Sequence, residues 1–252
     1  MLTVDLNCDL GEGFGPYRLG EDEALMPYLS SVNIACGFHA GDPALMRQTV
    51  AAALAHGLAI GAHPGLPDRQ GFGRRNMAIS PQEAYDLVLY QVGALQAFVQ
   101  AAGARLQHVK PHGALYNMAA RDPGLARAIA QAVQDLDPRL KLYALAGGAL
   151  LHEARALGLT GVSEVFVDRG YGADGQLLPR GTPGALLDSE AAAVAQLLSL
   201  VREQGVRTPD GHWVALEAQT VCLHGDGPHA LSFTRSCAAA LKQAGIGCRA
   251  PA

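Results

Sequence analysis

The sequence contains no run of basic residues and no long apolar stretch. Its formal net charge is −4, its sequence pI is about 6.1, and its densest positive spot is the pair Arg74-Arg75. Nucleic-acid binding without sequence preference needs clustered lysines and arginines that displace counterions. A membrane-spanning helix needs roughly 18 or more consecutive apolar residues. We therefore expect neither a nucleic-acid partner nor a membrane span.

The N-terminus and the cysteines lack the marks of a secreted protein. The opening segment MLTVDLNCDLGEG has no positively charged region and reaches an aspartate before an apolar run develops, so it does not resemble a signal peptide. The cysteines are odd in number and form no CxxC pair; they are Cys8, Cys36, Cys222, Cys237 and Cys248. We interpret them as reduced thiols of a cytoplasmic protein, the first three serving as small core residues.

Several motifs of nucleotide-binding proteins and hydrolases are also missing. The chain has no GxxxxGK[ST] phosphate loop, no GxGxxG segment opening a helix after the first strand, no GxSxG nucleophile elbow and no HExxH metal motif. The segment Gly71-Phe72-Gly73-Arg74-Arg75 is glycine-rich and basic, which is compatible with closing over an anion, but it matches none of these motifs.

What the sequence does contain is a regular alternation of apolar runs and helical patterns. The strand-like runs span 2–8, 31–36, 59–62, 108–110, 141–146, 164–167 and 216–223, and most are apolar on both faces. Helical patterns lie between and after them at 43–56, 81–102, 124–136, 149–157, 189–204 and 228–244. This order predicts a parallel sheet with crossover connections. We predict an α/β fold, a distorted seven-stranded (β/α) barrel over residues 1–252 as one domain; a doubly wound open sheet is the alternative.

Helix boundaries carry local signals. Asp42-Pro43 and Ser80-Pro81 each place a capping side chain before a proline at the first helical position. Glycines stand where helices are expected to stop, and we predict that each supplies the left-handed terminal residue: Gly57, Gly103, Gly158, Gly205 and Gly245. The long irregular stretches 65–77 and 168–188 are typical of binding loops.

Polar residues gather just after the apolar part of nearly every strand run. The set comprises Asn7, Asp9, Glu12, His39, Asp42, His63, Lys110, His112, Asp168, Arg169, His224 and Asp226. Because the carboxyl ends of parallel strands share one rim, residues far apart in sequence are expected to converge there. This convergence predicts a functional site at the mouth of the barrel.

Individual members of the set allow more than one interpretation. Asp9, His39 and His63 together form a two-histidine, one-carboxylate set suited to a divalent ion. Glu12 alone is equally compatible with tightening a glycine turn, and a single histidine is often structural. The pair Asp168-Arg169 resembles a strand-end ion pair whose guanidinium could bind a carboxylate.

Lys110 stands out because the chain holds 16 arginines and only three lysines, yet one lysine occupies a strand end between His108 and His112. A partly buried ammonium can polarise a carbonyl or phosphate, and its pKa falls when it is desolvated. The alternative is a lysine paired with carboxylates inside the rim. His224 ends the last run, and the glycine after it allows close approach of the backbone to a ligand.

Taken together, these segments resemble the LamB/YcsF family. The matching stretches are DLNCDLGEGFG at 5–15, VNIACGFHAGDP at 32–43, IGAHPGLPDRQGFGRR at 60–75, HVKPHGALYN at 108–117, EVFVDRGY at 164–171 and PRGTPGALL at 179–187. The family's fold resembles the distorted barrel of the NodB-type polysaccharide deacetylases, in agreement with the alternation described above.

The resemblance implies the reaction of a bacterial 5-oxoprolinase A subunit, in which 5-oxo-L-proline, ATP and water give L-glutamate, ADP and phosphate. It implies ATP as cosubstrate, a divalent cation as a further candidate, and B and C subunits as partners; the absent phosphate loop leaves open which subunit binds ATP. Whether the chain also forms homo-oligomers is left open.

On this reading the catalytic candidates are Asp9, His39, His63, Lys110 and His112, with Asp9 or His39 as base or metal ligand. The substrate-binding candidates are Asn7, Glu12, Asp168, Arg169 and His224. Lys110 and Arg169 are expected to stabilise an anion. Two rival functions are a metal-dependent carbohydrate N-deacetylase on the same barrel and a non-catalytic regulator of lactam utilisation.

Overall fold

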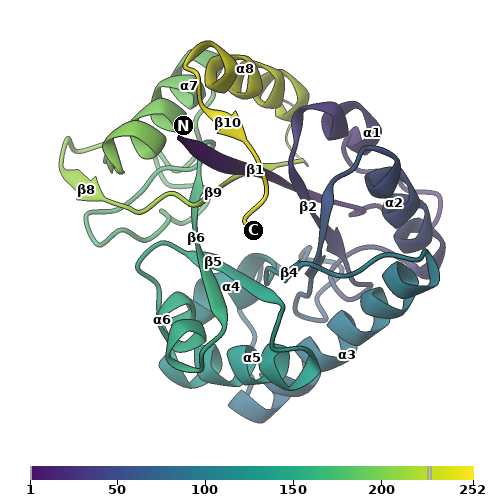
Figure 1. Cartoon of the computed structure of the whole chain (residues 1–252). Coiled ribbons are helices and arrows are strands. Elements are labelled where there is room, and N and C mark those ends of the chain that lie inside the picture. Colours follow the sequence, from purple (N-terminus) through teal and green to yellow (C-terminus); the bar gives the residue numbers. More distant parts are fainter. Residues whose placement is uncertain (1, 226, 228) are drawn as a thin grey trace.

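The computed structural model describes residues 2–225, 227 and 229–252, so Asp226 lies outside the described residues. Its centre is a closed barrel of seven parallel strands surrounded by helices (Figure 1). The strands are β1 (Thr3–Leu10), β2 (Ser31–Ala35), β3 (Ala59–His63), β4 (His108–Val109), β5 (Lys141–Leu145), β6 (Thr160–Phe166) and β9 (Thr220–His224). They follow one another around the barrel in chain order, and β1 pairs with β9 from Asp5–Thr220 to Asp9–His224. This pairing closes the sheet, which confirms the predicted barrel and makes the open-sheet alternative wrong.

Most strand boundaries lie within two residues of the prediction, and two differ by four. β6 begins at Thr160, four positions before the predicted run at Glu164. The predicted run 216–223 forms a strand only from Thr220. Residues 216–219 connect this strand to a small antiparallel hairpin, formed by β7 (Gly205–Arg207) and β8 (Trp213–Ala215). A short strand β10 (Gly247–Cys248) adds to the beginning of β1.

The outer helices agree closely with the expected ranges. They are α2 (Pro43–Ala55), α3 (Pro81–Ala101), α5 (Pro123–Leu136), α6 (Ala149–Ala156), α7 (Glu190–Leu198) and α8 (Ala230–Gln243). A π-helical turn, Ser199–Glu203, continues α7. Three short elements were not predicted: α1 (Asp22–Leu25), the 3₁₀ turn Met26–Tyr28, and α4 (Gly113–Ala119) directly after β4.

The predicted caps are present. Asp42 Oδ1 accepts hydrogen bonds from the backbone N–H groups of Ala44 and Leu45 at 2.9 and 3.0 Å. Ser80 and Glu83 form a reciprocal capping box at the start of α3. These contacts satisfy backbone donors that have no partner inside the helix.

Four of the five glycines predicted to end helices have positive φ, namely Gly57, Gly103, Gly158 and Gly245. Gly205 does not, and that prediction was wrong: Gln204 takes the left-handed conformation instead, with φ 53°. Glycine is needed at 205 for another reason, since a Cβ there would lie 2.4 Å from the ring of Trp213.

The inside of the barrel is polar, which the expected apolar-on-both-faces pattern missed. Asn7 Nδ2 on β1 donates to Glu164 Oε1 on β6 at 2.9 Å, although these strands are not neighbours in the sheet, so both side chains point into the barrel. Alternate residues of β1, such as Leu6 and Cys8, are buried among the apolar side chains of the core cluster. β1 therefore shows a period-two pattern, apolar toward the helices and polar toward the interior.

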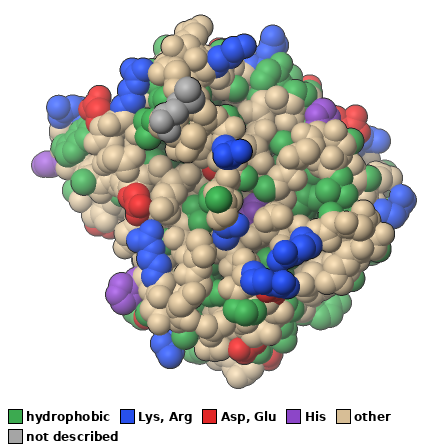
Figure 2. Space-filling model, in the orientation of Figure 1, with side chains coloured by type: hydrophobic (Ala, Val, Ile, Leu, Met, Phe, Trp, Pro, Cys, Tyr) green, Lys and Arg blue, Asp and Glu red, His purple; other side chains and the backbone are tan. Residues whose placement is uncertain are grey.

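Among the described residues, no helix combines the length and apolarity that crossing a membrane requires. On the face shown in Figure 2, Lys and Arg side chains occur singly or in small groups, some of them beside Asp or Glu side chains.

Candidate functional site

The residues at the carboxyl ends of the strands meet around one cavity. Asp9 lies near the end of β1 and Glu12 just after it, His39 follows β2, and His63 ends β3. All are buried. Lys110 and His112, which follow β4, join them and are each 2% exposed. The structure thus brings together the five predicted catalytic residues; their roles stay predictions.

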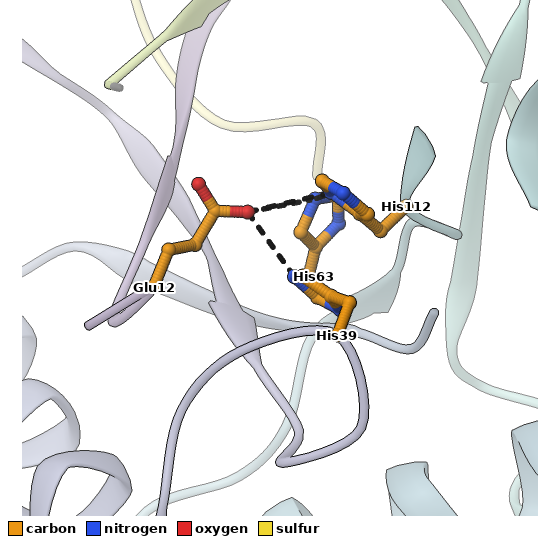
Figure 3. Close-up of side chains that lie close together, drawn as sticks. All are labelled: Glu12, His39, His63 and His112. Carbon is orange, nitrogen blue, oxygen red and sulfur yellow. Dashed lines mark hydrogen bonds and ion pairs between the residues drawn. The ribbon is translucent and has the colours of Figure 1, made fainter. Parts of the chain in front are cut away.

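Three imidazoles and one carboxylate form the densest part of the cluster (Figure 3). His63 Nε2 lies 2.9 Å from His112 Nδ1. Glu12 Oε1 lies 3.1 Å from His39 Nε2 and 3.3 Å from His112 Nδ1. The rings of His39 and His112 stack with their centroids 3.7 Å apart.

Backbone carbonyls fix the tautomers of two of these rings. His63 Nδ1 donates to Lys110 O at 2.7 Å, and His112 Nε2 donates to Phe72 O at 2.8 Å. If both rings are neutral, the remaining nitrogens, His63 Nε2 and His112 Nδ1, direct lone pairs at each other. Burial lowers the pKa of His112 well below its usual range, which favours the neutral form of that ring. A bound cation would satisfy both lone pairs.

The arrangement fits a divalent cation. The ligand atoms of Glu12, His39, His63 and His112 all lie within 4.8 Å of one another. Metal–nitrogen and metal–oxygen bonds of about 2.1 Å place adjacent ligands roughly 3.0 to 3.4 Å apart, close to the shorter separations observed here. The sequence had suggested Asp9 with His39 and His63; in the structure Glu12 and His112 complete the set, and Asp9 Oδ2 adjoins it at 3.2 Å from His63 Nε2.

Loop 65–77 packs against the cluster, and two of its glycines make this close approach possible. A Cβ on Gly65 would lie 2.5 Å from His39 Nδ1. A Cβ on Gly73, whose φ is +63°, would lie 2.7 Å from His39 Cβ and 2.8 Å from His112 Cδ2. Glycine therefore lets the backbone lie directly on the imidazole rings.

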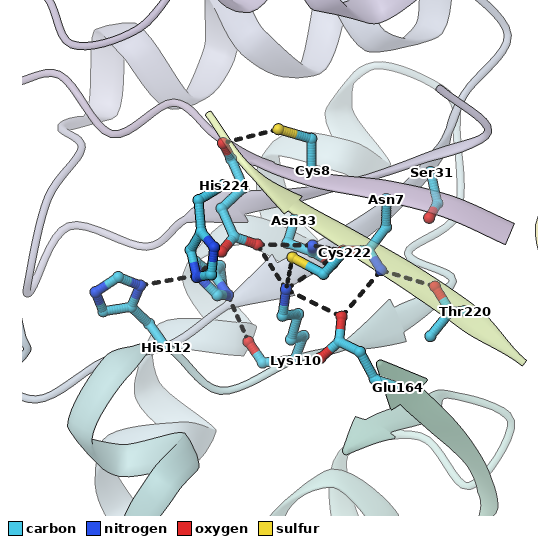
Figure 4. Close-up of polar contacts among 12 residues, drawn as sticks. Asn7, Cys8, Ser31, Asn33, Lys110, His112, Glu164, Thr220, Cys222 and His224 are labelled. Carbon is cyan, nitrogen blue, oxygen red and sulfur yellow. Dashed lines mark hydrogen bonds and ion pairs between the residues drawn. The ribbon is translucent and has the colours of Figure 1, made fainter. Parts of the chain in front are cut away.

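Lys110 is the centre of a second, deeper network (Figure 4). Its Nζ atom lies 2.9 Å from Asp9 Oδ1, 3.0 Å from Glu164 Oε1 and 2.9 Å from Cys222 Sγ. Burial alone would lower the pKa of Lys110, but Asp9, Cys222 and Glu164 more than offset it, and the pKa lies well above its usual range. The expectation of a lowered pKa was wrong. The paired-lysine alternative is what the structure contains, and Lys110 stays a cation.

The same contacts keep Asp9 ionised. Burial would raise the pKa of this carboxyl group, but His63 and Lys110 outweigh burial and hold the pKa well below its ordinary value. Asp9 is therefore a buried carboxylate whose charge is balanced by Lys110, facing both the imidazole cluster and the cavity.

Asp168 and His224 form a further pair at the edge of the cavity, where His224 lies opposite Asp9 in the β1–β9 pairing. Asp168 Oδ2 accepts a hydrogen bond from His224 Nδ1 at 2.7 Å, and the His224 ring stacks against Phe166. The predicted ion pair between Asp168 and Arg169 was wrong, since Arg169 instead donates to the carbonyl oxygens of Ala185 at 3.1 Å and Leu178 at 2.6 Å.

The cavity enclosed by these groups measures about 430 Å³. Its described lining includes Asp9, His63, Lys110, His112 and His224, together with side chains that the sequence had not assigned: Tyr116, Arg121, Phe166, Leu177, Leu178 and Arg180. Asn7 lies below it, bonded to Glu164, Thr220 and Asn33 rather than exposed to a ligand.

Glu164 and Cys222 are two of the buried residues that the sequence interpretation missed. Both lie inside apolar strand runs, and Cys222 had been assigned to the core as a small hydrophobe. A glutamate within such a run was the available signal, because a carboxylate is rarely buried without a partner.

Known proteins resemble this chain over nearly its whole length. The model of the LamB/YcsF family matches residues 4–252. A Bordetella pertussis protein named as the A subunit of 5-oxoprolinase is 61% identical over 248 residues, covering 98% of each chain. A solved structure of a lactam utilization protein from Thermus thermophilus has a TM-score of 0.94 at 49% identity and covers 99% of this chain and 100% of that one.

A more distant likeness concerns the fold alone. A polysaccharide deacetylase from Bacillus cereus has a TM-score of 0.53 at 11% identity, covering 100% of this chain and 93% of the other. The predicted similarity to the barrel of polysaccharide deacetylases is confirmed at the level of architecture.

Proposed function

The chain belongs to the LamB/YcsF family, and from this membership we propose that it is the A subunit of a 5-oxoprolinase, a hydrolase that opens the cyclic amide of 5-oxo-L-proline to give L-glutamate. The observation that carries the proposal is the 61% identity over 98% of both chains with a protein of that name. The buried Asp9 carboxylate and the imidazole cluster beside one cavity support it, because amide hydrolysis needs a water-activating base and a group that polarises the carbonyl.

A divalent cation held by Glu12, His39, His63 and His112 would supply Lewis-acid polarisation of the lactam carbonyl and would lower the pKa of a bound water. We propose that Asp9 accepts the proton of the attacking water; in support, its carboxylate is ionised and borders the cavity. Lys110 holds Asp9 in that state and adds fixed positive charge near the carbonyl oxygen.

We propose that His224 orients the lactam ring and gives a proton to the ring nitrogen as the C–N bond breaks. Asp168 holds His224 Nδ1, which leaves Nε2 as the atom for this exchange. These two groups approach the cavity from β6 and β9, whereas the imidazole cluster approaches from β1 to β4.

The coupling to ATP follows from the stability of the substrate. A five-membered lactam is little strained, and amide resonance resists attack at neutral pH. Phosphoryl transfer from ATP to the lactam oxygen makes the ring carbon electrophilic; water then adds, the C–N bond breaks, and hydrolysis releases phosphate. We propose that this sequence takes place in a complete cytoplasmic enzyme with B and C subunits. The five free cysteines are in keeping with a reducing compartment.

The test is production of glutamate and ADP from 5-oxoproline by this chain alone, by the partner subunits alone, and by the complete set. We expect equal amounts of both products only from the complete set, and absence of turnover there would contradict the proposal. Equilibrium binding of ATP to each purified component locates the nucleotide site. Acetate release from an N-acetylated sugar without ATP would favour the deacetylase alternative. An unchanged pathway flux with an Asp9→Ala chain would favour a regulatory role.

A further inference from the structure

An exposed apolar segment follows the carboxyl end of β1. Among the described residues, seven large hydrophobic side chains are exposed, and three of them lie within six positions of one another: Phe14 at 39%, Tyr17 at 75% and Leu19 at 38%. Every residue of segment 14–20 is exposed. Single exposed apolar side chains are ordinary, whereas a cluster of them is typical of an interaction surface.

The backbone of this segment is held in place, so the segment presents a defined surface. The backbone N–H groups of Phe14 and Tyr17 each donate to the carbonyl oxygen of the other, at 2.8 and 2.9 Å. Asp42 Oδ2 accepts a hydrogen bond from the Gly15 N–H at 2.9 Å. The guanidinium carbon of Arg69 lies 3.6 Å from the centroid of the Phe14 ring. A partner that binds here therefore has little of the backbone left to order.

A groove of about 610 Å³ lies between this segment, α1 and α2. Its apolar lining includes Phe14, Tyr17, Leu19 and Leu45. Its charged lining among the described residues consists of four carboxylates and one guanidinium, namely Glu21, Asp22, Glu23, Asp42 and Arg18. The groove is therefore both apolar and negatively charged.

The charge of the groove decides which occupant it suits. An oxyanion such as a nucleotide phosphate would meet four carboxylates, and like charges brought together destabilise a complex. A second copy of the chain, docked through the same surface by two-fold symmetry, would bring two acidic grooves together. A different polypeptide that presents a lysine or arginine beside apolar side chains matches both the charge and the apolar surface.

The segment lies at the same end of the barrel as the cavity. It begins two residues after Glu12, which belongs to the imidazole cluster. At its other end, Gly20 packs against Gly225 so closely that a Cβ on Gly20 would lie 2.7 Å from the Gly225 carbonyl oxygen. Gly225 directly follows His224, which lines the cavity. A partner seated on the segment would therefore lie close to the reacting groups.

We propose that segment 14–20 and the acidic groove beside it form the docking surface for the assembled B and C subunits of the enzyme. Those subunits place a lysine or arginine in the groove and apolar side chains against Tyr17 and Leu19. The inference rests on the proposed function, which supplies the partner, and it adds where that partner binds and by what chemistry.

The test measures the affinity of the purified chain for the purified B and C subunits, mixed in equal amounts, by titration calorimetry. The groove variants are Tyr17→Ser and Glu21→Lys; the side chain of Glu21 makes no capping hydrogen bond to α1. The matched controls are Tyr90→Ser on α3 and Glu203→Lys after α7, both exposed and outside the groove lining. Thermal unfolding of each variant checks that the fold is retained.

We expect each groove variant to raise Kd for the B and C subunits about tenfold or more, and both controls to leave it unchanged. Added salt should weaken binding of the wild-type chain more than binding of Glu21→Lys, because salt screens the attraction between the groove and a cationic side chain. In turnover assays the groove variants should need a higher concentration of the B and C subunits to reach half-maximal rate.

Unchanged Kd in both groove variants, or a wild-type chain that does not associate with the B and C subunits, would overturn the docking surface. A dimer of the wild-type chain alone that Tyr17→Ser dissociates, measured by sedimentation, would assign the surface to a second copy and overturn the proposal as well.

Turnover by the complete wild-type set is scored separately. Full turnover with unaffected groove variants would reject this surface and leave the proposed function standing. Weakened association of the groove variants, without turnover by the wild-type set, would support the surface and reject the proposed function.

Discussion

His112 Nδ1 lies 2.9 Å from His63 Nε2, while the opposite nitrogen of each ring donates to a backbone carbonyl. The two atoms that face each other are therefore lone-pair acceptors if both rings are neutral. With Glu12 Oε1 3.3 Å from the same His112 nitrogen, the fold has assembled a set of ligand atoms around a point that suits a cation.

Metal binding is the first prediction. We expect the purified chain to bind one equivalent of a divalent transition ion, and His112→Ala to weaken its affinity by at least roughly 10–100-fold, the loss typical of disturbing even outer groups of a metal site. Metal content after dialysis and competition with a chelator measure this. His152→Ala, at a histidine 82% exposed, is the control. Equal metal content in wild type and His112→Ala would refute the site.

Replacement of Gly73 tests how closely loop 65–77 covers the imidazoles. Gly73→Ala puts a Cβ within 3 Å of both His39 and His112 at a positive φ, so we expect loss of stability of about 1–3 kcal/mol together with weaker metal binding. Gly93→Ala is the matched control, because nothing lies within 4 Å of that position in α3 and alanine favours a helix. Urea denaturation should show the control stabilised by up to about 1 kcal/mol. A stabilised Gly73→Ala would contradict the packing.

Much of this arrangement was predictable from the sequence, because barrel strands are local apolar runs and their ends are marked by glycine, proline and polar residues. The order of strands followed from the alternation, and Asp9, His39, His63, Lys110 and His112 converge as expected. What local patterns could not reveal were contacts made across the barrel.

Glu164, for example, lies 3.0 Å from the ammonium group of Lys110, and the two side chains meet because the sheet closes into a barrel. Arg180 lines the cavity from an irregular segment that has no periodicity and that Arg169 contacts through Leu178 O. The hairpin of β7 and β8 did have a signal, the Pro209-Asp210-Gly211 turn, but its strands are only three residues long.

Stability should depend on pH through His108, which lies inside the barrel with Nε2 2.7 Å from Asn33 Oδ1. Burial, and then Lys110, lowers the pKa of His108 to about 3, against about 6.5 in the unfolded chain. Between these values the unfolded state binds the additional proton. The contribution of neutral His108 to the free energy of unfolding is therefore present above about pH 6.5. It is lost as the pH falls toward 3, with a slope of about 1.4 kcal/mol per pH unit.

Urea denaturation of wild type and His108→Gln between about pH 7 and pH 4.5 measures this slope. We expect the free energy of unfolding of the variant to fall less than that of wild type as the pH is lowered. The difference between the two should grow by about 1.4 kcal/mol for each pH unit below about 6.5. His152→Gln serves as the exposed control. Parallel curves for wild type and His108→Gln would show that this histidine does not titrate as proposed.

The Asp168–His224 pair should act as a unit. Asp168→Asn replaces the carboxylate that accepts from His224 Nδ1, so in the complete enzyme we expect kcat to fall by roughly 10²-fold, and His224→Gln to cause a similar loss. The double variant should be little worse than either single one. Asp135→Asn, on α5, is the control, at a carboxylate that bonds to Tyr85 and Gln131 away from the cavity. Additive losses would argue that the two residues act independently.

The most direct test of the account is turnover of 5-oxoproline by the complete enzyme assembled with an Asp9→Asn chain. This substitution keeps the shape of the side chain but removes the ionised group that lies beside Lys110, His63 and the cavity. We predict that glutamate formation falls by roughly 10²-fold or more while the chain stays folded and assembled. Turnover within about twofold of wild type, measured in the same reconstitution, would contradict the assignment of the reaction to this cavity.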